Sequence, residues 1–342
     1  MKKILVTGGC GYIGSHTIVS LIEHGFEVIS VDSMERGRKY VPERVEKITG
    51  KKIQNYQINM CNLRNLRSVF MDHPDLEGII HFAAFKMVGE SVEKPLKYYG
   101  NNLLSLMNLL LCIKEYKTPQ LIFSSSSSVY GNVKSLPVKE DTAVTEQVSP
   151  YGRTKYMGEL MITDFAKAHT FHALLLRYFN PAGAHDSALI GEPIEDKPLN
   201  LVPAITKTAA GRQEKFFVNG TDYPTRDGSC IRDYVHVMDI AEAHVLALEY
   251  LMKKQLDESY LDIINLGTGN GVTVLEMVHA FESASGVKLN VEYGPRREGD
   301  AEAVFADNTK AKELMGWEPK RSLESMMLSA WKWEQAHAAQ AQ

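Results

Sequence analysis

The sequence lacks the cysteine pattern of a disulfide framework or a zinc site. Its 342 residues contain four cysteines, Cys10, Cys61, Cys112 and Cys230, which lie far apart and form no C-x-x-C pair. Disulfide-stabilised domains and zinc sites carry closely organised cysteines. The scattered pattern therefore predicts reduced thiols, a cytoplasmic protein and no metal site.

A long hydrophobic run and an excess of positive charge are also missing. The most apolar segment, residues 103–113, is much shorter than the roughly 20 residues that span a membrane, and it contains Ser105 and Asn108. The first residues, MKKILVTGG, have no cleavage site of small residues. Lys and Arg total 38 against 42 Asp and Glu, so the net charge is −4, unlike that of a nucleic-acid-binding domain. We expect neither a membrane nor a nucleic acid as a partner.

The sequence does contain short β-branched runs that alternate with helical patterns. Near-continuous apolar strands in such an alternation predict an α/β fold, a doubly wound, Rossmann-like parallel sheet with helices on both faces. The expected strands are KILV near the start and residues 27–32, 52–59, 78–84, 120–126 and 172–180.

A smaller second lobe is expected after Asn180. From there on, segments rich in Pro, Gly and Asp separate shorter elements, as in lobes built largely from loops. Residues 234–267 nevertheless read as a strand, a helix and another core strand, so the second lobe should be interleaved with the sheet. We expect a first domain over residues 1–180 with contributions from about 234–267, and a second lobe mainly over 181–342.

A glycine-rich turn, TGGCGYIG at residues 7–14, joins the first strand to the first helix. Glycine permits a tight turn and close approach of the backbone to a pyrophosphate, while the helix N-terminus supplies amide donors. Asp32 ends the second strand, where its carboxylate would bind ribose hydroxyls and repel a 2′-phosphate. The pattern predicts a dinucleotide site that prefers NAD, and Arg36 and Arg38 leave NADP as the alternative.

Three residues suggest proton transfer beside a nicotinamide. Tyr151 and Lys155 are one turn apart at the start of a predicted helix over 151–168, so they share one face. A phenol with a pKa of about 10 is a poor base, but an ammonium and an oxidised nicotinamide nearby favour the phenolate. Ser126 ends the strand at 120–126, at the edge where open α/β sheets bind ligands. Together they predict removal of a hydroxyl proton by Tyr151 as hydride leaves.

The chain resembles the extended short-chain dehydrogenase/reductase family in three motifs that occur in the family's order: TGGCGYIG, the FSSS strand end and YGRTK. The segments HFAAFKMVGESVEKPLKYYGNN, SSVYG, RYFNPAGAH, GTDYPTRDGS, IRDYVHVMDIA and REGD are similar to the subgroup that epimerises UDP-hexoses at C4. The resemblance implies tightly bound NAD and a transient 4-keto sugar that turns and is reduced on its other face. Tyr151 would be the base, Lys155 would hold the nicotinamide ribose, and Ser126 would bind the substrate oxygen.

The same resemblance assigns ligand contacts by position. The implied cofactor positions are Gly8, Gly11, Tyr12, Ile13, Gly14, Asp32, Ser33, Asn59, Met60, Phe82, Ala83, Lys86, Asn101, Tyr151, Lys155 and Phe179. The implied UDP-sugar positions are Lys86, Ser126, Tyr151, Asn180, Asn200, Leu201, Phe216, Phe217, Val218, Arg232, Arg297, Asp300 and Val304. Arginines suit a diphosphate, and a carboxylate suits ribose hydroxyls. Asn59 stands where the family usually has an aspartate that binds the adenine amine, and its carbonyl can accept the same bond.

Other functions within this fold require different residues at the same positions. Nucleotide-sugar 4,6-dehydratases have T-D-E before V-Y-G, whereas this chain has Ser126, Ser127 and Ser128. Without those carboxylates, neither dehydratase nor uronate decarboxylase chemistry is expected. A non-catalytic NAD-sensing protein would not need an intact Tyr151, Lys155 and Ser126, and a reductase with an external cofactor would consume NADH stoichiometrically.

Two expectations concern substrate breadth and assembly. By composition, REGDAEAVFAD at residues 297–307 is a solvated charged loop, but the resemblance places Val304 where strict glucose/galactose enzymes carry a tyrosine at the edge of the sugar pocket. The smaller valine suggests that UDP-GlcNAc and UDP-GalNAc are also substrates. The apolar segment 103–113 and the helix from Tyr151 resemble the family's dimer bundle, so we expect a homodimer, with packing inside the subunit as the alternative.

Overall fold

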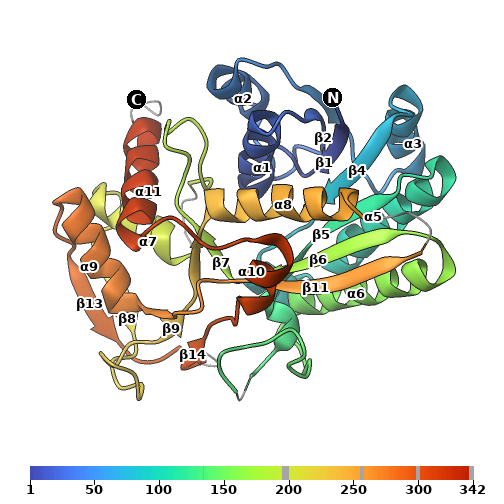
Figure 1. The fold of residues 1–342 in the computed structure, drawn as a ribbon. Coiled ribbons are helices and arrows are strands. Elements are labelled where there is room, and N and C mark those ends of the chain that lie inside the picture. The colour runs from blue at the N-terminus through green and yellow to red at the C-terminus, as the bar shows by residue number, and fades with distance from the viewer. Residues whose placement is uncertain (134, 195–199, 255–257, 298–300, 339–342) are drawn as a thin grey trace.

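A seven-stranded parallel sheet forms the centre of the protein in this computed structural model (Figure 1). The structure describes residues 1–133, 135–194, 200–254, 258–297 and 301–338. Across the sheet, the strands lie in the order β11 (Tyr260–Leu266), β6 (His172–Tyr178), β5 (Gln120–Ser126), β4 (Leu76–His81), β1 (Lys3–Thr7), β2 (Glu27–Asp32) and β3 (Gln54–Gln57). The strand order reverses between β1 and β4, which confirms the predicted doubly wound fold and marks the point where such sheets bind ligands.

Side chains of the sheet alternate between two hydrophobic cores. In β1, Ile4 and Val6 belong to one core, and Leu5 belongs to the other. In β4, Ile80 and Ile79 are divided between the same two cores. Because successive side chains of a strand point to opposite faces and both faces are covered, these strands are apolar throughout.

Helices cover the sheet on both faces. The face with Ile4 packs against α1 (Tyr12–Glu23), α2 (Val41–Thr49), α8 (Val237–Met252) and α10 (Thr309–Met315), and α8 crosses in front of the sheet in Figure 1. The opposite face carries α3 (Leu63–Asp72), α5 (Pro95–Tyr116) and α6 (Pro150–Ala168), with α4 (Val88–Glu93) beside the last two. In the part of the chain that the structure describes, no helix is long and apolar enough to cross a membrane.

Local signals explain where α6 begins. The Ser149 side chain accepts a hydrogen bond from the Gly152 amide at 3.2 Å, and Pro150 occupies the first turn. Ser is a favoured N-cap residue, and Pro is favoured at the first helical position, where it needs no hydrogen bond. The helix therefore starts one residue before Tyr151 and places Tyr151 and Lys155 in its first two turns.

The second lobe lies beside the carboxyl ends of the strands and has its own small core. Its helices are α7 (Leu201–Ala209), α9 (Val274–Ser285) and α11 (Leu323–Ala338). Its short strands are β8 (Phe216–Asn219) with β13 (Val291–Gly294), and β9 (Ile231–Arg232) with β12 (Val272–Thr273) and β14 (Ala303–Val304).

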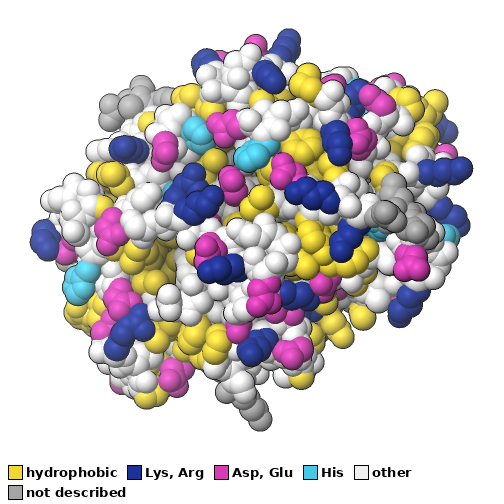
Figure 2. Space-filling view, in the orientation of Figure 1, with side chains coloured by type: hydrophobic (Ala, Val, Ile, Leu, Met, Phe, Trp, Pro, Cys, Tyr) yellow, Lys and Arg dark blue, Asp and Glu magenta, His cyan; other side chains and the backbone are white. Residues whose placement is uncertain are grey.

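Part of the chain returns from the second lobe to the sheet. The strand β10 (Tyr234–His236) pairs with β7 (Asn180–Ala182), α8 then packs on α1, and β11 pairs with β6 as the edge of the sheet. The lobe is thus interleaved with the sheet in sequence. Figure 2 shows acidic and basic side chains intermixed over one face of the molecule, without a broad basic surface there.

Candidate active site

A cleft of about 720 Å³ opens at the carboxyl ends of the strands and extends to the second lobe. Its wall includes the β1–α1 turn, the ends of β2, β4 and β5, the start of α6, and residues of α7, β8 and β9. The volume falls within the usual range of about 300–1,000 Å³ for small-molecule sites. The cleft thus lies at the switch point between β1 and β4.

The structure brings almost all the predicted site residues together. Every predicted cofactor position lines the cleft, from Gly8 to Phe179. The predicted substrate positions on its wall are Lys86, Ser126, Tyr151, Asn180, Asn200, Leu201, Phe216, Phe217, Arg232 and Arg297. Segments that are far apart in sequence therefore converge on one cleft.

Three predicted substrate residues are not placed on the wall. Val218 in β8 is fully buried in the core of the second lobe. Val304 in β14 packs against a small cluster that includes Tyr130 and Phe179, so it lies behind Phe179, which lines the cleft. Val304 was expected at the edge of the sugar pocket, but the structure does not place it on the cleft wall. Asp300 lies outside the described residues.

The glycine turn forms a close-packed cradle at the start of α1. Gly8 has a φ of +71°, and a Cβ on it would lie 2.8 Å from the Ala83 nitrogen. A Cβ on Gly14 would overlap the Gly8 carbonyl oxygen. Gly11 precedes α1, and no side chain caps the helix. The uncapped amides at the cleft wall fit the pyrophosphate of a dinucleotide.

Asp32 is held at the other end of this cradle. Its carboxylate accepts hydrogen bonds from the Cys10 amide at 3.0 Å and the Met34 amide at 2.9 Å. Burial raises the pKa of Asp32, and these two amide bonds act in the opposite direction. One bond per oxygen leaves acceptor capacity for ribose hydroxyls. Arg36, one of the two arginines that could bind the 2′-phosphate of NADP, instead forms an ion pair with Glu90 at 2.8 Å.

Lys155 is buried and Tyr151 is partly buried, and burial moves their pKa values apart. Burial raises the pKa of Tyr151 to about 12, and the Ser126 hydroxyl acts to lower it. Burial lowers the pKa of Lys155 to about 8, against the attraction of Glu159. The Lys155 ammonium donates to the Ser124 carbonyl at 2.5 Å and lies 6.0 Å from the centre of the Tyr151 ring. This geometry favours the phenolate while Lys155 is charged.

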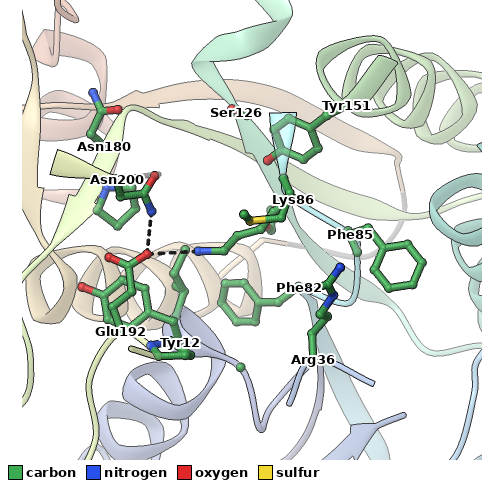
Figure 3. Close-up of a pocket in the computed structure, with 18 of the residues that line it drawn as sticks. Tyr12, Arg36, Phe82, Phe85, Lys86, Ser126, Tyr151, Asn180, Glu192 and Asn200 are labelled. Carbon is green, nitrogen blue, oxygen red and sulfur yellow. Dashed lines mark hydrogen bonds and ion pairs between the residues drawn. The ribbon is translucent and has the colours of Figure 1, made fainter. Parts of the chain in front are cut away.

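Ser126 completes the proton-transfer group at the end of β5. Its hydroxyl donates to the Ser128 hydroxyl at 3.1 Å and accepts from the Ser128 amide at 3.2 Å. Figure 3 shows Ser126 and Tyr151 on the same side of the cleft. The three residues are therefore arranged to bind one substrate oxygen and to move its proton.

A buried ion pair beneath the site was not predicted from the sequence. Glu159 accepts hydrogen bonds from Arg177 at 2.8 and 2.5 Å and from the Ser125 hydroxyl at 2.5 Å. It joins α6 to β5 and β6, and its charge acts to raise the pKa of Lys155. The signal was its spacing, four residues after Lys155, which puts both side chains on one helix face.

Two more polar residues were missed. Asn102 of α5 bonds the backbone amide and carbonyl of Phe85 and the Thr154 hydroxyl, so it fixes the loop after β4 against α6. Glu192 enters the cleft and contacts Lys86 and Asn200 (Figure 3). No local pattern marks either residue, because their partners are remote in sequence.

Comparison with known proteins gives consistent matches over nearly the whole chain. The model of the family described as GDP-mannose 4,6 dehydratase matches residues 5–329. UDP-glucose 4-epimerase from Bacillus subtilis is 44% identical over 335 residues, which cover 98% of this chain and 97% of that protein.

Solved structures match equally well. UDP-glucose-4-epimerase from Stenotrophomonas maltophila, with bound NAD and formylated UDP-arabinopyranose, is 41% identical and has a TM-score of 0.95, covering 99% of this chain and 100% of that one. UDP-glucose 4-epimerase from Bifidobacterium longum, in complex with NAD⁺ and UDP, is 40% identical with a TM-score of 0.91, covering 98% and 99%.

Proposed function

The chain belongs to the UDP-glucose 4-epimerase group of the extended short-chain dehydrogenase/reductase family, and we propose that it reversibly epimerises UDP-glucose and UDP-galactose at C4. The observation that carries the proposal is the convergence of Ser126, Tyr151 and Lys155 on the same cleft as the glycine cradle. The domain of residues 1–180, with 234–267, would hold NAD, and residues 181–342 would mainly hold the UDP-sugar.

The residues of the cleft fit NAD and divide its binding among them. The uncapped start of α1 would hold the pyrophosphate, and Asp32 would accept from the ribose hydroxyls. Lys155 would donate to the nicotinamide ribose. When bound, NAD supplies reversible hydride transfer, which allows one site to oxidise and then reduce the same carbon.

Proton movement belongs to Tyr151. Its phenolate oxygen accepts the proton of the sugar's 4-hydroxyl, and it returns this proton to O4 after the 4-keto sugar has turned within the cleft. The Lys155 ammonium stabilises the phenolate. The Ser126 hydroxyl donates a hydrogen bond to O4 of the sugar. Since one oxidation and one reduction occur at C4, the cycle has no net redox change.

The cleft does not support the dehydratase reaction that the name of the matching family model suggests. Elimination of water needs an acid and a base beside the sugar, and the residues that follow β5 are Ser127 and Ser128. Among the described wall residues, the carboxylates are Asp32, Glu35 and Glu192. None of them follows β5, so the acid and base of a dehydratase are lacking there.

The test is turnover without added cofactor. Purified protein is mixed with UDP-galactose, and UDP-glucose is measured by chromatography in the absence of added NAD or NADH. Equilibration of the two sugars is expected. Turnover only with stoichiometric NADH would support a reductase, and exchange of bound NAD without turnover would support an NAD-sensing protein.

We also propose a homodimer formed through α5 and α6. These helices pack side by side and expose five apolar side chains that are 37–47% accessible: Leu104, Met107, Leu111, Met157 and Leu160. Exposed apolar patches of this kind are typical of subunit interfaces. Sedimentation of a monomer at micromolar concentration would contradict the dimer. None of the four cysteines, all within the described residues, forms a disulfide, which supports a cytoplasmic location.

A further inference from the structure

The proton-transfer chemistry described above does not use Glu192, a carboxylate within the cleft. Its Oε1 atom lies 3.3 Å from the Lys86 ammonium and accepts a hydrogen bond from the Asn200 amide at 2.6 Å (Figure 3). Lys86 follows β4 of the sheet, whereas Asn200 immediately precedes α7 of the second lobe. Glu192 therefore engages two predicted ligand-binding side chains from opposite sides of the cleft.

The backbone around Glu192 is anchored, so this position is built into the fold. The Glu192 carbonyl accepts a hydrogen bond from the Trp333 indole at 2.7 Å. Gly191 lies so close to the same ring that a Cβ would come within 2.5 Å of it. Arg44 of α2 donates to the Leu189 carbonyl at 2.9 Å. The Glu192 side chain is only 13% exposed, and the last helix of the chain holds it in the cleft.

Lys86 contacts this carboxylate and also lies near the first residue of α1. Its side chain is 51% exposed, and its ammonium lies 5.8 Å from the centre of the ring of Tyr12, the first residue of α1. A helix N-terminus and a lysine both attract a diphosphate. Glu192 neutralises the lysine and repels the same anion. A diphosphate that contacts Lys86 must therefore compete with Glu192.

We propose that the Glu192 carboxylate competes with the diphosphate group of a bound nucleotide for the Lys86 ammonium. When the diphosphate binds Lys86, the ion pair between Glu192 and Lys86 breaks. When that ion pair forms again, the nucleotide dissociates faster. Glu192 thus weakens nucleotide binding and sets the rate of release. The inference rests on the proposed function only in taking the cleft to bind nucleotides, and both NAD and a UDP-sugar carry the required diphosphate.

Glu192→Gln tests the proposal because the amide is nearly the same size and can still accept from Asn200 but carries no charge. UDP binding to the protein with its NAD retained is measured by calorimetry, and the loss of bound NAD during dialysis is followed by absorbance. We expect UDP to bind at least about threefold more tightly, or NAD to be lost at least about threefold more slowly. The first result assigns the competition to the sugar nucleotide, and the second assigns it to the dinucleotide.

Two controls separate competition from a general charge effect. Glu43→Gln removes the same charge from an exposed pair with Lys47 on α2, and it should change neither measurement. In a Lys86→Met background, Glu192→Gln should have a clearly smaller effect, because only the direct repulsion between Glu192 and the anion remains. The proposal is overturned if Glu192→Gln changes neither measurement, if it weakens binding, or if its effect is undiminished without Lys86. Turnover of UDP-galactose by the unaltered protein tests the proposed function separately.

Discussion

Replacing Lys155 with methionine tests whether its charge makes Tyr151 a base. The Lys155 ammonium lies 6.0 Å from the centre of the Tyr151 ring. At an effective dielectric constant of about 20, a charge at that distance stabilises the phenolate by roughly 3 kcal/mol. That energy corresponds to about two units of pKa, so the phenolate population at neutral pH should fall about 100-fold. We expect Lys155→Met to lower kcat about 100-fold at pH 7.

The shape of the pH profile gives a second and sharper test. Below pH 8, the phenolate fraction of Tyr151 rises with pH because its pKa of about 12 lies far above. Above the Lys155 pKa of about 8, the ammonium is lost and the gain should stop. The activity of the unaltered protein should therefore rise up to about pH 8 and then level off. In Lys155→Met, it should continue to rise.

Initial rates of UDP-galactose conversion from pH 6 to 9 check both expectations. Bound NAD is measured in the same samples, so that loss of the cofactor is not mistaken for loss of the base. The reasoning is refuted if the variant retains its NAD and loses less than about tenfold in kcat. It is also refuted if the variant levels off at the same pH as the unaltered protein.

Three further substitutions test other parts of the site. Glu159→Gln leaves the buried Arg177 without its carboxylate and should lower the free energy of unfolding by about 3–5 kcal/mol in urea titrations; a loss below about 1 kcal/mol would contradict this. Gly14→Ala places a Cβ against the Gly8 carbonyl, so the purified protein should contain at least about tenfold less NAD by absorbance, and normal NAD content would disprove the cradle. Val304 packs against the cluster that contains Phe179, which lines the cleft, so a tyrosine there should push Phe179 into the space of an N-acetyl group. Val304→Tyr should then selectively abolish conversion of UDP-GalNAc, and equal effects on UDP-galactose and UDP-GalNAc would rule out a role in substrate breadth.

The fold and the proton-transfer group could be predicted because short stretches of sequence determine them. The glycine turn, the strand ending at Asp32 and the helix beginning beside Tyr151 each follow from local geometry. Parallel strands place their carboxyl ends at one edge, so locating the strands also located the cleft. The distances and pKa values in that cleft could not be predicted, because they depend on which side chains surround each group.

The residues that sequence reasoning misplaced or missed lack such local signals. The strand β14 has only two residues, Ala303 and Val304, so no alternation shows which way Val304 points. Val218 lies in a four-residue strand whose inner face packs in the second lobe. Glu192 contacts Lys86, which lies 106 residues away in sequence. Contacts of that kind are set by the packing of whole lobes and are invisible to patterns of spacing.

The two lysines of the cleft differ in the freedom of their carboxylate neighbours. Glu159, whose charge supports Lys155, is almost fully buried and held by Arg177 and Ser125. It cannot move toward a ligand, so the environment of Lys155 stays constant while Tyr151 exchanges a proton. Glu192 has no such ion pair with an arginine among the described residues, and its Lys86 contact faces the cleft. A fixed carboxylate suits the tuning of a base, whereas an exchangeable one suits the binding and release of an anion.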